Sequence, residues 1–220
     1  MVGYLELIYG SMYSGKTEEL LRRLRRCTFA NKKFQLFKPS IDDRYSSTDV
    51  VTHDNAIVKN KVEKIVSVYI DDEDKNYNSL LNELYKNIGC AIKSEVVNCS
   101  SDIIKLLQDD VQVVGIDEVQ FFDKDIISVI EELNDRGIRV IATGLDMYAS
   151  SQPFGDIVPQ LACTAKYVTK LHGVCVDCGA EGYTSYKLDN SDPAKIDVGS
   201  TGKYICLCEN CAERRDKEKK

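Results

Sequence analysis

The chain has 220 residues, of which 43% are hydrophobic and 29% are charged, and its net charge is −6. This length allows one well-packed domain with a smaller appendage, and the composition is that of a globular protein. An acidic balance argues against nucleic acid or an anionic membrane as a partner, so we expect neither. No apolar run is long enough to cross a bilayer and no charged segment precedes the first strand, so we expect a cytoplasmic location.

A predicted strand over residues 4–9 leads directly into the sequence GSMYSGKT, which matches G-x-x-x-x-G-K-[ST], a phosphate-binding loop. Its glycines let backbone N–H groups turn toward phosphate oxygens, its lysine can reach the β- and γ-phosphates, and its threonine can bind Mg²⁺. Leucines at helical spacing follow, so the phosphate would sit at a helix N-terminus. The candidate ligands for ATP and Mg²⁺ are Gly10, Ser11, Met12, Tyr13, Ser14, Gly15, Lys16 and Thr17.

Further strands and helices are predicted along the chain. The strands cover residues 34–38, 50–52, 95–98, 111–116 and 138–143, and the helices cover residues 76–88, 102–107 and 123–136. Ser101 is the expected cap of the second helix, and Gly137 is expected to end the third. Apolar strands between amphipathic helices predict an α/β fold with a mostly parallel sheet and helices on both faces.

The character of the sequence changes after about Cys163, where regular alternation fades and cysteines, glycines and tyrosines become frequent. We therefore predict a nucleotide-binding domain over residues 1–162 and a smaller domain over residues 163–220. The smaller domain ends in a charged tail, which we expect to fray.

Two carboxylates, Asp117 and Glu118, follow the apolar strand over residues 111–116. Proteins with this phosphate loop place an acid at such a strand end to hold Mg²⁺. Neighbouring side chains on an extended backbone point in opposite directions, so the two acids are expected to act differently. If Asp117 faces the metal, Glu118 can take a proton from an attacking hydroxyl or orient a water. The alternative is that Glu118 is a surface residue at the start of a loop.

Four cysteines form two C-x-x-C pairs, Cys175 with Cys178 and Cys208 with Cys211. Two such pairs match a tetrahedral zinc site, and a metal there would hold together the ends of the intervening loop. A redox pair and simple buried thiols are the alternatives. Cys206 could replace Cys208 as a ligand, although Cys208 makes the second pair match the first.

Taken together, these motifs resemble the thymidine kinases of the cytosolic, tetrameric type (type II). The matching segments lie in order over most of the chain and are Met12–Thr17, Ile116–Phe122, Gly144–Gly155 and Cys175–Cys211. The resemblance implies a RecA-like P-loop domain with a zinc-stapled lasso domain, assembled as a homotetramer. It also implies Mg²⁺-dependent transfer of the ATP γ-phosphoryl group to the 5′-hydroxyl of thymidine, a step of DNA-precursor salvage.

The resemblance also assigns roles to individual residues. Glu118 matches the general base. Nucleotide-site positions are Asp117, Glu118, Val119 and Gln120, together with a phosphate-side loop of Asp42, Asp43 and Arg44, in which Arg44 would stabilise the transferring charge. The lasso would close over the nucleoside through Lys195, Ile196, Asp197, Val198, Gly199 and Tyr204. The thymine methyl group would lie among Met12, Leu145 and Thr184.

Two features depart from the family pattern. Ala149 stands where family members carry an aromatic residue, with Tyr148 one place earlier, and the segment over residues 60–93 is longer than the family requires. Two rival functions also fit the motifs: a P-loop ATPase with a zinc ribbon for nucleic acid or protein partners, and a regulatory protein that binds nucleotide without turnover. Consumption of ATP that depends on thymidine would separate the kinase from both.

Overall fold

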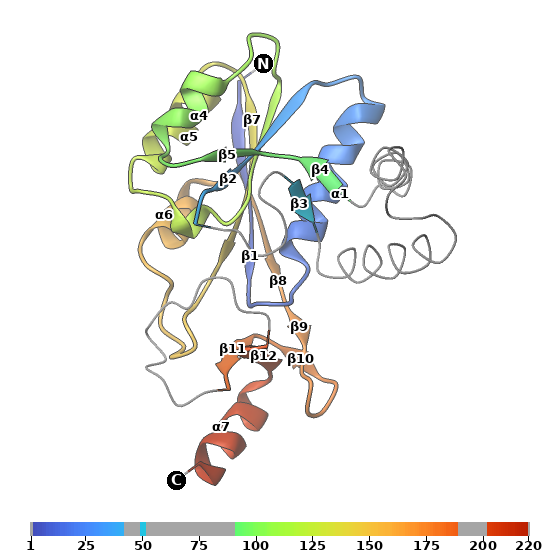
Figure 1. The fold of residues 1–220 in the computed structure, drawn as a ribbon, viewed down its shortest axis with the longest axis vertical. Coiled ribbons are helices and arrows are strands. Elements are labelled where there is room, and N and C mark those ends of the chain that lie inside the picture. The colour runs from blue at the N-terminus through green and yellow to red at the C-terminus, as the bar shows by residue number, and fades with distance from the viewer. Residues whose placement is uncertain (1, 42–48, 52–90, 189–201, 220) are drawn as a thin grey trace, which may run out of the picture.

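The computed structural model describes residues 2–41, 49–51, 91–188 and 202–219. A larger α/β unit carries the main sheet, and a small unit with two short sheets lies at one end of it (Figure 1). Several predicted features lie outside the described residues: the helix over 76–88, the phosphate-side residues Asp42, Asp43 and Arg44, and the lasso residues Lys195 to Gly199.

The main sheet has six strands in the order β5-β2-β6-β7-β1-β8. All its pairings are parallel, which confirms the parallel sheet expected from the sequence. The strands are β1 (Tyr4–Gly10), β2 (Phe34–Pro39), β5 (Glu95–Val97), β6 (Val113–Ile116), β7 (Arg139–Leu145) and β8 (Tyr167–Leu171). Side chains of β6 are buried on both faces, which explains its unbroken apolar sequence.

Helices cover both faces of this sheet, as predicted (Figure 1). On one face, the leucines of α1 (Lys16–Phe29) pack against Ile8, Leu36 and Ile141. On the other face, the apolar residues of three helices pack against inward-facing residues of the central strands. These helices are α4 (Ser101–Leu106), α5 (Ile126–Asp135) and α6 (Ile157–Thr164), and the short helix η1 (Val119–Phe121) follows β6.

Two helix starts differ from the sequence-based expectation. Helix α4 has Ser100 as its N-cap residue, not Ser101, and the Ser100 hydroxyl donates to Asp123 instead of capping the helix. Helix α5 begins at Ile126, three residues later than predicted, because the Asp123 carboxylate accepts hydrogen bonds from Ser100 and Asp125 N–H groups. Its end is as expected, since Gly137 adopts a left-handed φ of 82° just beyond the last turn.

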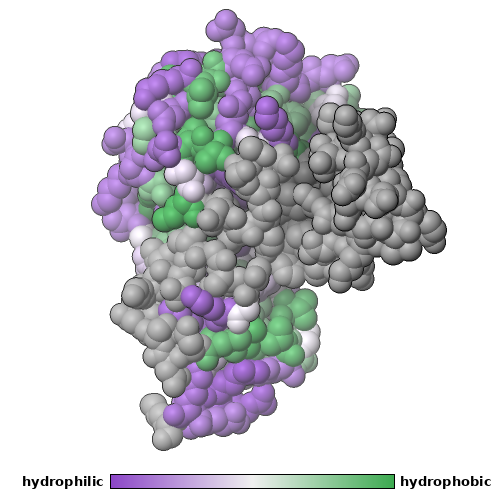
Figure 2. All heavy atoms as spheres, in the orientation of Figure 1, coloured by the Kyte–Doolittle hydropathy of each residue, from purple (hydrophilic) through white to green (hydrophobic). Residues whose placement is uncertain are grey.

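The small unit, residues 173–188 and 202–219, follows β8 without a break in the chain. Two hairpin-like pairs form it, β9 (Gly173–Val174) with β10 (Glu181–Gly182) and β11 (Thr184–Lys187) with β12 (Tyr204–Leu207). The last helix, α7 (Glu209–Glu218), presents hydrophilic residues and lies beside a group of hydrophobic residues (Figure 2). Outside this unit, a third short sheet pairs β3 (Asp49–Val51) with β4 (Ala91–Lys93).

The position of β8 concerns the predicted boundary between the two domains, at residues 162 and 163. Although β8 follows Cys163, it pairs with β1 as the edge strand of the main sheet. We therefore propose that the small unit begins near Gly173 and that residues 163–172 belong with the main sheet. Among the described helices, none has the length and apolar character that crossing a membrane requires.

Replacement of Gly3 by alanine should destabilise this fold. A Cβ atom at Gly3 would lie 2.4 Å from the carbonyl oxygen of Ile138 and 2.5 Å from that of Asn134, both backbone atoms that cannot move aside independently. We expect Gly3→Ala to lower the free energy of unfolding by about 1–3 kcal/mol in urea denaturation. The neighbouring Val2, which is 89% exposed, provides the control, because Val2→Ala should change the free energy of unfolding by less than about 0.5 kcal/mol. Equal midpoints for the two variants would contradict this account.

Candidate active site

The phosphate-binding loop connects β1 to α1 at the end of the sheet that faces the small unit (Figure 1). Gly10 is required because a Cβ there would lie 2.1 Å from the carbonyl oxygen of Leu171 in β8. Gly15 takes a left-handed φ of 79° immediately before α1. The Ser11 carbonyl accepts hydrogen bonds from the Ser14 hydroxyl at 2.8 Å and from Lys16 Nζ at 2.6 Å. The loop therefore curls around the Lys16 ammonium group, which is buried.

The first acid after β6 reaches the phosphate loop, although β7 separates β6 from β1. Each carboxylate oxygen of Asp117 lies 3.5 Å from the Thr17 hydroxyl oxygen. Thr143, on the intervening strand β7, donates a hydrogen bond from its hydroxyl to the same carboxylate. Hydroxyl and carboxylate oxygens are the hard ligands that Mg²⁺ takes, so this pair fits a magnesium site.

The second acid, Glu118, is turned away from Asp117 by its backbone. Its φ of 51° is left-handed, a conformation that costs a residue with a side chain about 1–2 kcal/mol. Gln120 fixes the side chain, because its amide Nε2 donates to Glu118 Oε2 while its Oε1 accepts the Leu145 N–H at 3.1 Å. Glu118 and Gln120 are both buried. The arrangement holds a carboxylate in one orientation beside the phosphate loop.

Other predicted site residues lie around the same edge of the sheet. Leu145, the last residue of β7, pairs in register with Gly10. The side chain of Val119 is fully buried in the core, so only its backbone can face a ligand. Tyr204 lies in β12 opposite Lys187, whose ammonium is 5.9 Å from the Tyr204 ring centre.

The contact between Met12 and the small unit comes from Ser185, the neighbour of Thr184. The Met12 N–H donates to Ser185 Oγ at 2.9 Å, and Ser185 is buried whereas Thr184 is half-buried. Successive strand residues point to opposite faces, so the two cannot both face the phosphate loop. Thr184 remains a prediction, and Ser185 is a site residue that the sequence reasoning missed.

Three aromatic rings form a further group that the sequence reasoning did not assign. The Tyr148 ring stacks on Phe154 with centroids 4.3 Å apart, and Phe121 meets Phe154 edge-on at 5.7 Å. Phe121 directly follows Gln120, and Phe154 is buried. Tyr148 thus supplies an aromatic ring beside Ala149, the position where the family pattern has one. The signal in the sequence was the aromatic residues at 121 and 154 within the two family motifs.

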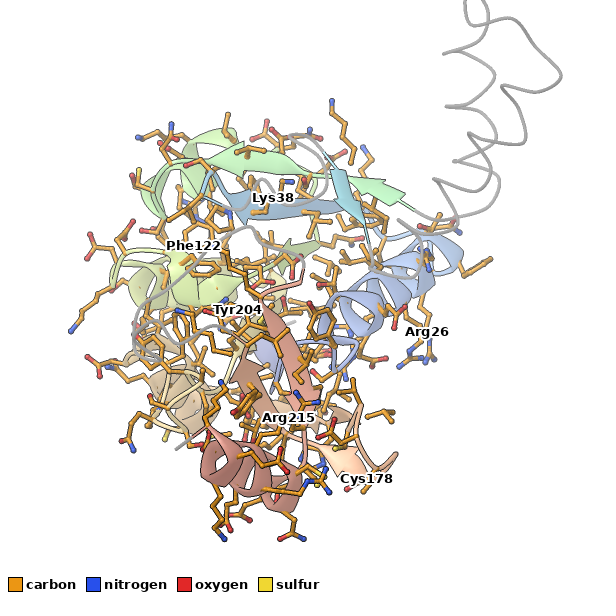
Figure 3. The ribbon with its side chains drawn as sticks, turned by 60° about the horizontal axis from the view of Figure 1, so that its bottom comes forward. Arg26, Lys38, Phe122, Cys178, Tyr204 and Arg215 are labelled. Carbon is orange, nitrogen blue, oxygen red and sulfur yellow. The ribbon has the colours of Figure 1, made fainter. Side chains whose placement is uncertain are left out.

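A buried lysine also lies at this edge. Lys38, near the end of β2, is 3% exposed (Figure 3), and the carbonyl of its neighbour Phe37 accepts the Asp117 N–H at 2.9 Å. A charged residue in a strand that is mostly apolar was the available signal, and the sequence reasoning did not use it.

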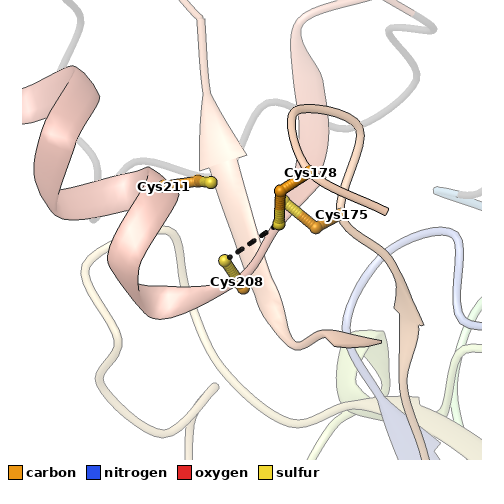
Figure 4. Close-up of side chains that lie close together, drawn as sticks. All are labelled: Cys175, Cys178, Cys208 and Cys211. Atoms are coloured by element: carbon orange, nitrogen blue, oxygen red, sulfur yellow. Dashed lines mark hydrogen bonds between the residues drawn. The ribbon is translucent and has the colours of Figure 1, made fainter. Parts of the chain in front are cut away.

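In the small unit, the four paired cysteines converge on one point (Figure 4). The Sγ atoms of Cys175, Cys178, Cys208 and Cys211 all lie within 4.8 Å of one another, and those of Cys178 and Cys208 are 3.7 Å apart. Zinc–sulfur bonds of about 2.3 Å in a tetrahedron place sulfurs about 3.8 Å apart, so this donor set fits Zn²⁺. Cys206 is not in this group, since its Sγ faces Ser11 Oγ at 3.7 Å.

The first C-x-x-C pair lies in a turn over residues 175–178, which we call the metal knuckle. Burial opposes ionisation of Cys175, but backbone N–H groups of Cys208, Cys178 and Asp177 outweigh it and lower the pKa of this thiol to about 6. Burial and the neighbouring sulfurs raise the pKa of Cys211 to about 12. Thiolates at this spacing would repel one another, and a bound cation would neutralise their charge.

An ion pair attaches α7 to this knuckle. Arg215 donates to both carboxylate oxygens of Asp177, at 2.6 and 2.8 Å (Figure 3 labels Arg215 and the nearby Cys178). These hydrogen bonds from Arg215 hold the pKa of Asp177 below its usual range. The bidentate geometry fixes the orientation of the helix that carries Cys211.

Together, the parallel sheet, the phosphate loop and the acid facing Thr17 define a P-loop nucleotide-binding protein of the α/β class. The thymidine kinase family matches the chain over residues 3–79 and 61–212. Thymidine kinases from two strains of Porphyromonas gingivalis are each 42% identical to it over 209 residues, which cover 95% of this chain and 84% of each relative. The chain belongs to the thymidine kinase family.

Among solved structures, domain III of the replication initiation protein DnaA from Thermotoga maritima aligns with 76% of this chain at 16% identity. The alignment has a TM-score of 0.36 and spans 55% of that chain. At that score it has no bearing on the function.

Replacement of Cys206, which lies in β12, and of Cys208, which follows β12, should affect the metal content of the protein differently. Because Cys208 Sγ lies in the four-cysteine group and Cys206 Sγ faces the phosphate loop, we expect Cys208→Ser to lower the bound zinc well below one ion per chain. Cys206→Ser should keep about one zinc per chain, measured by elemental analysis of the purified protein. Loss of zinc from Cys206→Ser, with retention in Cys208→Ser, would reverse the ligand assignment.

Proposed function

We propose that this protein transfers the γ-phosphoryl group of ATP to the 5′-hydroxyl of thymidine. The observation that carries this proposal is the pair of acids after β6. Asp117 faces the Thr17 hydroxyl of the phosphate loop, while its neighbour Glu118 is turned away and held by Gln120. One acid is thus placed for a metal–phosphate complex and the other for an incoming nucleophile. Membership of the thymidine kinase family supports the choice of nucleoside.

The phosphate loop would bind the triphosphate. Helix α1 begins at Lys16, directly after Gly15, and the helix dipole favours negative charge at this end. Lys16 would move its ammonium from the Ser11 carbonyl to the phosphate oxygens. Thr17 and Asp117 would hold Mg²⁺, which supplies charge neutralisation at the phosphates when bound.

Glu118 would act as the general base. A carboxylate within hydrogen-bond reach of the 5′-hydroxyl can accept its proton as the oxygen attacks the γ-phosphorus. Gln120 keeps this carboxylate in one orientation, since the Leu145 N–H fixes the Gln120 amide in turn. Burial excludes water from the base and so favours transfer to the nucleoside over hydrolysis of ATP.

The thymine base would lie next to the end of β7. Leu145 and the aromatic group of Phe121, Tyr148 and Phe154 offer flat apolar surface at the end of β7. Met12 and Thr184 would contribute to the pocket for the methyl group, and Tyr204 with residues 195–199 would close over the base. As the family resemblance implies, Asp42, Asp43 and Arg44 would contact the phosphates.

We further propose that the four-cysteine group binds one structural Zn²⁺, on the strength of its sulfur spacing. Assembly as a homotetramer is a proposal that rests on the family resemblance alone, and a cytoplasmic location is a proposal that rests on the sequence pattern and that resemblance.

The reaction is tested with purified protein, labelled ATP, Mg²⁺ and a panel of nucleosides. We expect ATP consumption to depend on thymidine and to yield thymidine 5′-monophosphate, with deoxycytidine and the purine deoxynucleosides inactive. ATP turnover that ignores nucleosides and increases with DNA would instead support a P-loop ATPase. Tight ATP binding without turnover in any mixture would support a regulatory nucleotide-binding protein.

Replacement of Glu118 separates chemistry from binding. Because Glu118→Gln keeps the size of the side chain and removes its basicity, we expect kcat to fall by about 10²- to 10⁴-fold. The affinity for a non-hydrolysable ATP analogue, measured by calorimetry, should stay within about twofold, since the phosphate ligands are untouched. Glu132→Gln, which removes a carboxylate from the surface of α5, controls for the loss of charge and should keep full activity. Unchanged kcat in Glu118→Gln would remove Glu118 as the base.

A further inference from the structure

Consecutive residues of the phosphate loop rest directly on the small unit. Ser11 Oγ donates to the Gly182 carbonyl at 3.5 Å, and the Met12 N–H donates to Ser185 Oγ at 2.9 Å. A Cβ atom at Gly173 would lie 3.1 Å from the Tyr13 carbonyl oxygen, so the two backbones are in close contact there. The outer side of the loop is therefore supported by residues about 170 positions later in the chain.

Ser185 makes the shortest of these contacts. Its side chain is buried in β11, and its hydroxyl oxygen accepts a backbone N–H of the loop. Removal of this acceptor would leave the Met12 N–H without its side-chain partner in a partly buried position, which costs more than the bond itself contributes. The contact thus fixes the backbone of the loop two residues after Gly10.

A second series of contacts continues from β11 to the four-cysteine group. Ser185 pairs in register with Cys206 of β12, and the Cys206 carbonyl accepts the Val176 N–H at 3.1 Å. Val176 lies between Cys175 and Cys178 in the metal knuckle. Packing here is tight, because a Cβ at Gly182 would lie 2.7 Å from Cys206 Sγ and 3.0 Å from the Cys175 nitrogen. The phosphate loop thus contacts β11, the metal knuckle contacts β12, and these two strands are paired with each other.

We propose that Ser185 is a positioning residue for the phosphate-binding loop and that it couples nucleotide binding to the four-cysteine metal site. A metal in the knuckle holds β11 and β12 in place, and β11 holds the loop in its phosphate-binding shape. Coupling of two binding sites is reciprocal, so bound nucleotide strengthens retention of the metal by the same factor. The proposal rests on the ATP-binding part of the proposed function and requires no assumption about the nucleoside.

The first experiment measures the affinity for the magnesium complex of a non-hydrolysable ATP analogue, by calorimetry and without nucleoside. We expect Ser185→Ala to weaken binding by about 5- to 10-fold, the effect of losing one hydrogen bond. Ser185→Thr retains the hydroxyl and should restore affinity to within about twofold. Tyr183→Phe is the matched control, because it removes a hydrogen bond to Glu209 within the same unit, 3.3 Å long and away from the loop.

The second experiment measures zinc release from the intact protein to a chromogenic chelator, with Mg²⁺ in excess. The ATP analogue should slow release several-fold in the unaltered protein and in Tyr183→Phe, and this protection should be lost in Ser185→Ala. Ser185→Ala should still hold about one zinc per chain, which shows that its fold is intact.

Equal analogue affinity in Ser185→Ala and the unaltered protein would overturn the proposal, as would zinc release that is indifferent to the analogue. An equal loss of affinity in Tyr183→Phe would also overturn it, because the effect would then belong to the stability of the small unit. These outcomes differ from failure of the proposed function: a chain that binds the analogue but does not phosphorylate thymidine can still show the coupling.

Discussion

The contact between Thr17 and Asp117 depends on the order of the strands in the main sheet. Hydrogen-bonded strands lie about 4.8 Å apart, so β1 and β6, with β7 between them, end about 10 Å from each other. Asp117 directly follows β6, and Thr17 lies in the first turn of α1, which the phosphate loop joins to β1. Thr143 of β7 fills the space between them and donates to Asp117. The parallel strand order therefore brings together the two oxygen ligands of the proposed magnesium site.

The two adjacent acids, for which we propose different roles, differ in backbone conformation. The sequence predicted separate roles for Asp117 and Glu118 from the alternation of side chains on an extended chain. In the structure, Glu118 is left-handed and begins η1, so the chain reverses instead of continuing the strand. This strained conformation is held by Gln120, which joins the Glu118 carboxylate to the backbone of β7. The two roles stay a prediction, while the local backbone differs from the extended chain on which that prediction was based.

The sequence allows prediction where a short motif determines local geometry. The phosphate loop, the acids after β6 and the C-x-x-C pairs were visible because each requires particular residue types at fixed spacing. Strands β9 and β10 have two residues each, too few to show any periodicity. The family resemblance names Thr184, and the sequence does not reveal the register of β11, which turns the Ser185 side chain toward the loop. The contact between Tyr148 and Phe154 was not foreseen because loop backbone, not sequence spacing, brings the two rings together.

The small unit cannot draw its stability from a core of its own. Within the described residues, its cluster of buried hydrophobic residues has only four members, Cys175, Tyr186, Leu207 and Cys211, and two of these belong to the four-cysteine group. A core of this size is normally supplemented by a metal or by packing against a larger body. Here both supports are present in the geometry, since the cysteines converge on one point and β11 binds the phosphate loop. Support of this kind acts in both directions. The small unit stabilises the conformation of the loop that would hold a triphosphate, and the loop stabilises the position of β11 in the small unit.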